Sequence, residues 1–239
     1  MNLWRIPKSK YKGLEARCAP GLHEAAAKQL LHNNVPRFGV LDLASGTGAF
    51  LARLRDNGFD DLHSIELDTK RFEIENITPC ALDLNSDFAS QMDRRFNVVT
   101  AIEIIEHLDN PRHLLRQVRL LLEDQGYLLV STPNISHWLG RIKFALTGDL
   151  RPFEANQYYL MRHITPMTDV QMRLMLKEIG FDLVNVVRAG SFAGPLRRAV
   201  LLPAASLFRL LFGKKVLGVV TIYLARKGYL AHSLVIARF

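Results

Sequence analysis

Two glutamates and a histidine that could carry out acid–base or metal chemistry lie close together in the middle of the chain. Glu103, Glu106 and His107 form the pattern E-x-x-E-H. If this segment is helical, positions i, i+3 and i+4 share one face, so two carboxylates and an imidazole point the same way. Such a set is half of a site for Mg²⁺ or Mn²⁺. His163, from a later segment, could complete it.

The same residues also allow chemistry without a metal. Glu106 and His107 could cap the helix and hydrogen-bond the following loop, with no further role. Alternatively, His107 or His163 acts as a general base, which contributes about 10²–10⁴ in rate. Glu106, His107 and His163 are therefore candidate catalytic residues in either chemistry, and Glu103 is a further candidate for the metal.

A small-residue turn earlier in the chain suits a cofactor. In residues 40–48 (VLDLASGTG) an apolar strand contains Asp42 and runs into a turn with Gly46 and Gly48, whose missing Cβ atoms let the backbone approach a ligand. The N-terminus of the next helix offers free N–H groups to a carboxylate. A dinucleotide-binding turn needs a third glycine where Leu51 stands, which disfavours a dehydrogenase.

Further acids follow the next two predicted strands. Glu66 closes the second strand, where its carboxylate can accept hydrogen bonds from both ribose hydroxyls. Asp83 ends the third strand, where a carboxylate can meet the adenine amino group. With Asp42, they place three acids at the carboxyl edge of the sheet, where doubly wound folds bind ligands. The pattern predicts an adenosyl ligand.

These residues resemble the motifs of class I S-adenosylmethionine methyltransferases, over about residues 35–190 and the last predicted strand. Residues 96–134 are especially similar to that family. The resemblance implies S-adenosylmethionine as cofactor, with Asp42 orienting the turn, the glycines facing the methionine end, Glu66 on the ribose and two residues bordering the adenine. The implied cofactor-binding set is Asp42, Ala44, Gly46, Gly48, Glu66, Asp83, Leu84 and Ile102.

Two details of the resemblance bear on the site. Ala44 stands where the family usually has glycine, and alanine costs little there if its φ is negative. The E-x-x-E-H pattern is similar to that of metal-dependent small-RNA 2′-O-methyltransferases and of coenzyme Q O-methyltransferases, where the cluster holds a cation against the substrate hydroxyl. This implies that Glu103, Glu106, His107 and His163 are metal ligands.

Strands and helices that must position these residues alternate along the chain, which specifies a doubly wound, mostly parallel α/β sheet. Helices are predicted at residues 21–32, 51–57, 110–123 and 167–179, and seven strands at 38–43, 62–66, 80–84, 96–102, 127–131, 181–187 and 233–238. We expect a single methyltransferase domain, 1–239, in four parts. These are an N-terminal helical segment (1–34), a cofactor-binding core (35–132), a substrate cap insertion (133–165) and an apolar, basic helical insertion before the last strand (191–230).

Positive charge is concentrated at the end of the chain. The net charge is +8, yet no Asp or Glu follows Asp182, while nine Lys or Arg residues do. Within 196–227, the uncharged runs 199–208 and 216–225 fall well short of the roughly 20 residues that span a bilayer. Two short apolar helices flanked by cations suit shallow burial at an anionic membrane surface. A dimer interface, or a helical hairpin packed on the sheet, is the alternative.

Other function classes are disfavoured. Nucleic acid binding is disfavoured because the cations alternate with Leu, Val and Phe, with no exposed aromatic platform. Cys18 and Cys80 are too far apart and too few for a disulfide framework, which indicates a reducing compartment. Residues 1–12 are polar and basic and do not resemble a secretory signal. We therefore expect a cytoplasmic protein, peripheral on the membrane.

The resemblance to the E-x-x-E-H enzymes implies methyl transfer from S-adenosylmethionine to a hydroxyl oxygen. The expected acceptor is a membrane-proximal small molecule, such as a lipid-linked sugar, a glycan precursor or a prenylated quinone. An RNA 2′-O-methyltransferase and a non-catalytic, membrane-associated adaptor that has kept the fold are the two alternatives. The sequence fixes neither the acceptor nor the oligomeric state.

Overall fold

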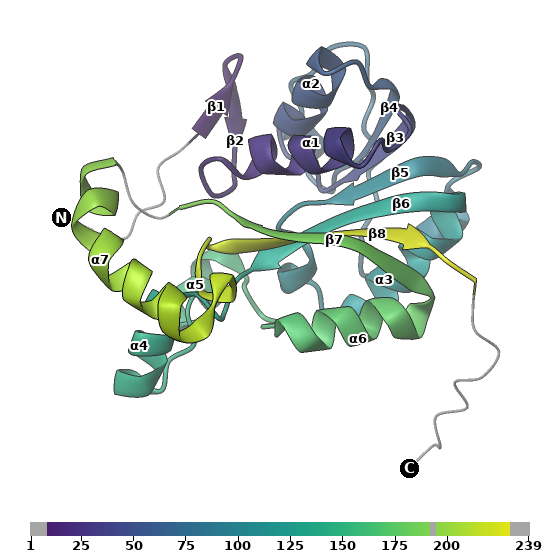
Figure 1. Cartoon of the computed structure of the whole chain (residues 1–239). Helices are drawn as coiled ribbons and strands as arrows, with labels where there is room; N and C mark the ends of the chain where they lie inside the picture. Colours follow the sequence, from purple (N-terminus) through teal and green to yellow (C-terminus); the bar gives the residue numbers. More distant parts are fainter. Residues whose placement is uncertain (1–8, 192–194, 230–239) are drawn as a thin grey trace.

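A six-stranded sheet forms the centre of the structure, a computed structural model that describes residues 9–191 and 195–229 (Figure 1). The strand order is β4-β3-β5-β6-β8-β7; β4, β3, β5 and β6 run parallel, and β8 runs antiparallel to both β6 and β7. The doubly wound, mostly parallel α/β class is thus confirmed. The strands are β3 (Phe38–Leu43), β4 (Asp60–Ile65), β5 (Phe96–Ala101), β6 (Leu122–Pro133), β7 (Phe181–Ala189) and β8 (Val220–Lys227), with a separate hairpin of β1 (Ser9–Tyr11) and β2 (Leu14–Ala16).

Helices cover both faces of this sheet: α1 and α2 lie on one face, and α3 and α6 on the other (Figure 1). A central strand is therefore apolar on consecutive residues, because successive side chains point to opposite faces. Val40 packs toward α1 and α2, whereas Leu41 packs toward α3 and α6. The helices are α1 (Leu22–His32), α2 (Ala49–Asp56), α3 (Pro111–Leu121), α4 (Trp138–Thr147), α5 (Ala155–Met161), α6 (Asp169–Ile179) and α7 (Pro195–Phe212), with 3₁₀ turns η1 (Thr69–Arg71), η2 (Phe88–Gln91), η3 (Ile105–His107) and η4 (Lys214–Val216).

Helices α3 and α6, on the same face of the sheet, begin with capping residues that can be recognised in the sequence. The Asn110 side chain accepts the N–H of His113 at the start of α3, and Pro111 occupies the first turn. α6 begins with a capping box between Thr168 and Gln171. These caps fix where each helix leaves the carboxyl edge of the sheet, where the candidate site residues gather.

One predicted helix is wrong. The apolar run 216–225, expected as a short membrane-surface helix, contains most of β8, which lies between β6 and β7 in the sheet. A short apolar run fits a buried strand as well as a buried helix, and β-branched residues such as Val220, Thr221 and Ile222 favour the strand. The strand predicted at 233–238 lies outside the described residues.

The predicted third strand, 80–84, is reduced to one contact. Cys80 forms an isolated parallel bridge with Ile65 at the edge of β4. Asp83 and Leu84 follow it in a turn that continues into η2. The carboxyl edge of the sheet is therefore built from regular strands at β3, β4, β5 and β6, with a loop on the β4 side.

Among residues 9–191 and 195–229, no helix combines the length and the hydropathy that crossing a bilayer requires.

Candidate functional site

The turn after β3 is held by hydrogen bonds from its own strand neighbours. Asp42 is buried, and the Thr100 hydroxyl donates to its Oδ1 at 2.5 Å from the adjacent strand β5. Burial raises the pKa of Asp42 to about 7, although the hydrogen bonds oppose that rise. The Ser45 hydroxyl donates to the Asp42 carbonyl at 2.9 Å and closes the turn. Asp42 thus lies buried at the end of β3, directly before the turn, with its side chain bonded to the neighbouring strand.

The turn itself requires left-handed backbone at three of its five residues. Ala44, Gly46 and Gly48 have φ values of 54°, 57° and 84°. Alanine is the departure from the family pattern, and its φ is positive, so the condition under which it would cost little is not met. A residue with a Cβ in this region is strained by about 1–2 kcal/mol.

Glu66 reaches the turn from the end of β4. Its Oε2 accepts the Gly46 N–H at 2.7 Å, and its Oε1 accepts the Asp68 N–H at 3.1 Å. Asp83 is exposed and accepts the Asn85 N–H at 2.9 Å, while Leu84 is buried in the core beside α3. The structure therefore brings Glu66 to the glycine turn, leaves Asp83 exposed and packs Leu84 into the core.

The turn forms one wall of a cavity of about 60 Å³, and an N-terminal segment that we did not predict as part of the site forms the other. On the sheet side the cavity is lined by Asp42, Ala44, Gly46 and Ile102, and on the N-terminal side by Glu15, Ala16, Arg17, Cys18 and His23. The Thr47 hydroxyl donates to the Glu15 carbonyl at 2.9 Å, which joins the two walls. A three-residue strand such as β2 leaves no hydrophobic period in the sequence, so nothing in the pattern indicates this wall.

The E-x-x-E-H segment is not a continuous helix, so the condition for a shared face is not met. Glu103 has a φ of 49°, and the 3₁₀ turn η3 begins only at Ile105. The Glu103 side chain consequently points toward the N-terminal segment, where its Oε2 accepts the Ala19 N–H at 3.1 Å. Burial raises its pKa to about 7. The expected shared face of Glu103, Glu106 and His107 is therefore not formed.

Glu106 is fully buried, yet neither of its carboxylate oxygens has a hydrogen-bond partner among the described residues. Burial raises the pKa of Glu106 well above its usual range, and the nearby Glu103 raises it further. The position is fixed by its backbone, because the Glu106 carbonyl accepts the N–H groups of Ile164 and Thr165, both at 3.0 Å. A buried carboxylate without partners is costly and commonly marks a functional site.

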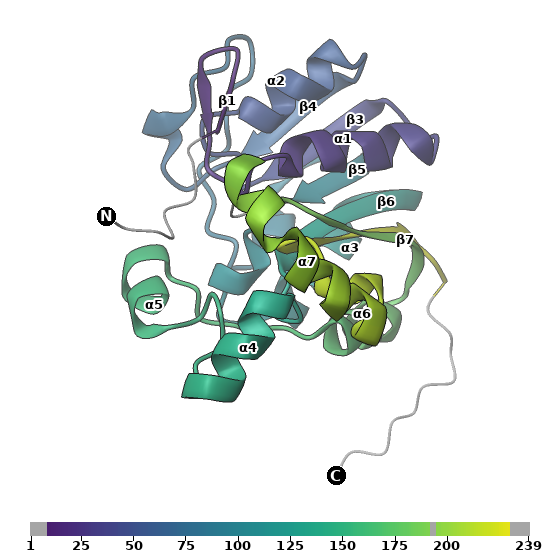
Figure 2. The ribbon, with the colours of Figure 1, turned by 60° about the vertical axis from the view of Figure 1, so that its left-hand side comes forward.

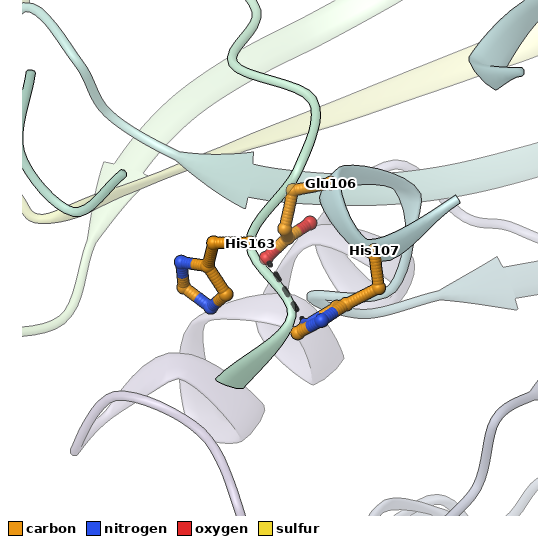
Figure 3. A group of neighbouring side chains, drawn as sticks. All are labelled: Glu106, His107 and His163. Carbon is orange, nitrogen blue, oxygen red and sulfur yellow. Dashed lines mark ion pairs between the residues drawn. The ribbon is translucent and has the colours of Figure 1, made fainter. Parts of the chain in front are cut away.

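Two histidines converge on this carboxylate (Figure 3). Ligand atoms from Glu106, His107 and His163 all lie within 4.8 Å of one another, and the two imidazole rings meet edge to face at 4.9 Å between centroids. The His163 Nδ1 contacts the Pro152 carbonyl at 3.0 Å, so this nitrogen carries the hydrogen and Nε2 keeps its lone pair. Burial lowers the pKa of His163 to about 4 and also lowers that of His107.

The structure thus brings His163 to Glu106 and His107, as the sequence predicts, and sends Glu103 to a different neighbour. The three form a compact set of one oxygen and two nitrogen donors at the carboxyl edge of the sheet, near the cofactor turn. Neutral imidazoles in such a cluster can accept a proton or bind a cation.

Comparison with known proteins shows the family to which the chain belongs. A family model described as a methyltransferase domain matches residues 12–186. The chain belongs to this family. It is a class I, S-adenosylmethionine-dependent methyltransferase, which confirms the resemblance noted in the sequence.

Individual relatives of this methyltransferase are distant. The chain is similar to a ubiquinone biosynthesis O-methyltransferase from Rickettsia typhi, at 25% identity over 114 residues. That match covers 44% of this chain and 45% of the relative, so the chain spans under half of the curated protein it matches.

Solved structures show the same fold at lower identity. A methyltransferase from Archaeoglobus fulgidus matches with a TM-score of 0.56 at 17% identity, over 86% of this chain and 94% of the other. Magnesium protoporphyrin IX methyltransferase from Synechocystis, a structure with bound SAH, matches with a TM-score of 0.55 at 14% identity, over 86% and 82%. These similarities establish the fold of the methyltransferase.

Proposed function

We propose that this methyltransferase transfers the methyl group of S-adenosylmethionine to a hydroxyl oxygen of a small molecule. The observation that carries the proposal is the cluster of Glu106, His107 and His163, in which a buried carboxylate with no hydrogen-bond partner among the described residues lies beside two neutral imidazoles. A hydroxyl acceptor must lose its proton as its oxygen attacks the methyl carbon, and this cluster offers groups that can take it. The distant O-methyltransferase from Rickettsia typhi supports the same chemistry.

In this proposal, residues on one side of the site hold the cofactor and residues on the other side remove the proton. The sulfonium already activates the methyl group, so alignment of oxygen and carbon supplies much of the rate, up to about 7–11 kcal/mol of the barrier. The turn at Ala44–Gly48, with Glu66, would fix the cofactor from one side. On the other side, His107 is the better base of the two histidines, because burial and the neighbouring His107 lower the pKa of His163 to about 4, whereas backbone hydrogen bonds oppose the smaller lowering at His107.

A divalent cation fits the cluster. In the part of the chain that the structure describes, Glu106 lacks hydrogen-bond partners for both oxygens, and the His163 Nε2 lone pair is free of the Pro152 contact, so Glu106, His107 and His163 would hold the ion. When bound, the ion would lower the pKa of the acceptor hydroxyl. Two imidazoles and one carboxylate favour Mn²⁺ or another transition metal over Mg²⁺, which prefers oxygen ligands. With Glu103 directed elsewhere, the ligand set is smaller than the four residues the sequence suggests.

The test uses methyl-labelled S-adenosylmethionine and a host-cell extract divided into lipid, soluble and RNA fractions. We expect label in a lipid or soluble small molecule, carried as an O-methyl group by mass spectrometry. Glu106→Gln should abolish the label while cofactor binding persists. Glu178→Gln is the control, because within residues 9–191 and 195–229 that exposed carboxylate pairs only with Arg112, at 3.2 Å, away from the site.

Each other outcome has a definite meaning. Label confined to RNA would replace the proposal with RNA 2′-O-methylation, and an N-methyl or C-methyl product would contradict the oxygen acceptor. Cofactor binding without label in any fraction would favour the non-catalytic adaptor. Loss of label with a chelator, restored by Mn²⁺, would assign the cluster to a metal, whereas label that resists the chelator would leave His107 as the base.

A further inference from the structure

Two helices from different insertions pack together at the carboxyl edge of the sheet. α4 follows β6 and α7 follows β7, and both views place them side by side (Figure 1, Figure 2). Their contact is aromatic: the rings of Trp138 and Phe208 lie 5.7 Å apart, and the Arg141 guanidinium lies 5.0 Å above the ring of Phe212. The two helices border an apolar groove of about 300 Å³ lined by Arg141, Ile142, Phe144, Ala145, Phe208 and Phe212.

This pair of helices is fixed to the sheet. The Asn134 side chain, between β6 and α4, donates to the carbonyls of Lys215, Leu217 and Gly218, at 3.1, 3.1 and 2.9 Å. These carbonyls belong to the segment that leads from α7 into β8. One buried amide therefore ties the start of α4 to the end of α7, so both helices keep a defined orientation to the active-site edge.

The outward face of the pair is apolar. On α7, the partly buried residues Leu201, Ala205 and Phe208 recur at helical spacing and mark the inward face. A surface helix ordinarily turns polar residues outward, but here Leu210 is 82% exposed and Leu146 of α4 is 79% exposed. The exposed apolar side chains of the pair are Ile142, Phe144, Leu146, Leu202, Leu207, Leu210, Leu211 and Phe212. An apolar surface of this extent marks an interaction site.

Positive charge lies beside this apolar face. Arg209, Lys214 and Lys215 are exposed and have no acidic partner among the described residues. Two carboxylates follow α4, at Asp149 and Glu154, and both pair with Lys143. No acidic residue occurs anywhere after residue 182. A partner suited to this surface must therefore be apolar and negatively charged together.

We propose that α4 and α7 form a docking surface for an anionic lipid bilayer, with the leucines and phenylalanines inserted at the headgroup boundary and Arg209, Lys214 and Lys215 on the lipid phosphates. An anionic bilayer presents both requirements in one surface. The sequence predicts two membrane-surface helices within residues 196–227. The second of these is β8 in the sheet, so α4 is the helix that accompanies α7 in the proposed surface. Docking in this way turns the carboxyl edge of the sheet, and the candidate site, toward the membrane.

The experiment is sedimentation with vesicles of phosphatidylcholine alone or mixed equally with phosphatidylglycerol, using the full chain. We expect binding to the mixed vesicles and much weaker binding to phosphatidylcholine. The triple variant Arg209→Gln, Lys214→Gln, Lys215→Gln should bind about 100-fold more weakly, from about fivefold for each cation. The double variant Leu210→Ser, Leu211→Ser should lose about tenfold or more.

A matched control removes the same charge elsewhere. Lys28, Arg116 and Lys177 are exposed on α1, α3 and α6, and their triple change to Gln should leave vesicle binding within about twofold, since long-range charge is screened at physiological salt. Cofactor binding should stay unchanged in every variant, because none of these residues touches the turn. This readout separates the docking proposal from the proposed reaction.

Three results would overturn the proposal. The first is no binding of the wild-type chain to mixed vesicles. The second is binding that the leucine variant leaves unchanged. The third is a concentration-dependent dimer, seen by sedimentation velocity, that the leucine variant dissociates while vesicles do not bind, which would assign the surface to a second copy of the chain.

Discussion

The two sides of the candidate site differ in how their buried polar groups are satisfied. On the cofactor side, Asp42 accepts a hydrogen bond from Thr100, and Glu66 accepts from the backbone N–H groups of Gly46 and Asp68. On the acceptor side, Glu106 is equally buried, and neither of its oxygens has a hydrogen-bond partner among the described residues; the His107 Nε2 lies 4.0 Å from its Oε1. The first arrangement stabilises the turn itself, whereas the second leaves bonding capacity for something outside the chain. Removing a hydrogen bond from the first arrangement should therefore lower the free energy of unfolding, whereas removing the Glu106 carboxyl should raise it.

The largest expected effect tests this contrast directly. Glu106→Leu should lower kcat by about 10²–10⁴, because the proton acceptor or cation ligand is lost. The same change should raise the free energy of unfolding, by about 1–3 kcal/mol, because a desolvated carboxyl without partners is removed. Thr100→Val has the same shape as the residue it replaces but should lower that free energy by about 1–3 kcal/mol, since it leaves Asp42 without its donor. Urea unfolding without cofactor measures both, and a Glu106→Leu protein less stable than wild type would contradict the contrast.

The next effect concerns pH. Burial raises the pKa of Asp42 from 3.8 to about 7, so between these values the folded chain keeps a proton that the unfolded chain has released. The contribution of Asp42 to stability therefore falls as pH rises from about 4 to about 7, by at most about 4 kcal/mol. Asp42→Asn cannot titrate and still accepts from Thr100, so its stability relative to wild type should rise over that range.

The comparison with the variant is needed because other groups act in the opposite direction. Burial lowers the pKa of His23 and of His137 to about 4, and these residues make the wild type less stable as pH falls. Both are present in the Asp42→Asn protein and cancel in the difference. A difference between the two proteins that is flat from pH 4 to pH 7 would show that Asp42 is ionised in the folded chain.

The smallest effects lie in the turn itself, where the backbone rather than a polar group is strained. Ala44→Gly should relieve about 1–2 kcal/mol of left-handed strain and lose part of it to the larger entropy of the unfolded glycine, for a net gain below about 1 kcal/mol. Gly48→Ala should do the reverse and more, because its new Cβ would lie 3.1 Å from the Cβ of Ile74 and 3.2 Å from Phe72. Thermal unfolding of the two variants should shift in opposite directions, and equal shifts would contradict the assigned φ values.

What could be predicted from the sequence follows the same division. The alternation of strands and helices, the glycine turn and the position of Glu66 at the end of the next strand depend on short-range patterns, in which apolar runs end in acids and small residues. The left-handed φ of Ala44 and of Glu103 could not be read this way, because both residue types ordinarily adopt negative φ. The direction of the Glu103 side chain, and with it the reduced ligand set, depends on that backbone.

The C-terminal part shows a second limit. The run 216–225 is apolar throughout, so it has no period to separate a strand from a helix, and its place is decided by the gap between β6 and β7. α4 is a similar case, since its exposed apolar face becomes part of the proposed docking surface only because α7 lies beside it (Figure 2). Contacts between residues far apart in the sequence decide both features.

The position of β8 also bears on how the chain reaches its fold. β8 is the last described strand, yet it pairs with β6 on one side and β7 on the other, joining Tyr127 to Arg226 and Phe181 to Lys227. Until it is synthesised, two strands present open edges, and such edges are templates for association with other chains. Pairing across so long a loop is slow compared with local helix formation. We therefore expect a nascent chain that lacks β8 to depend on chaperones, and the finished sheet to close in a late, cooperative step.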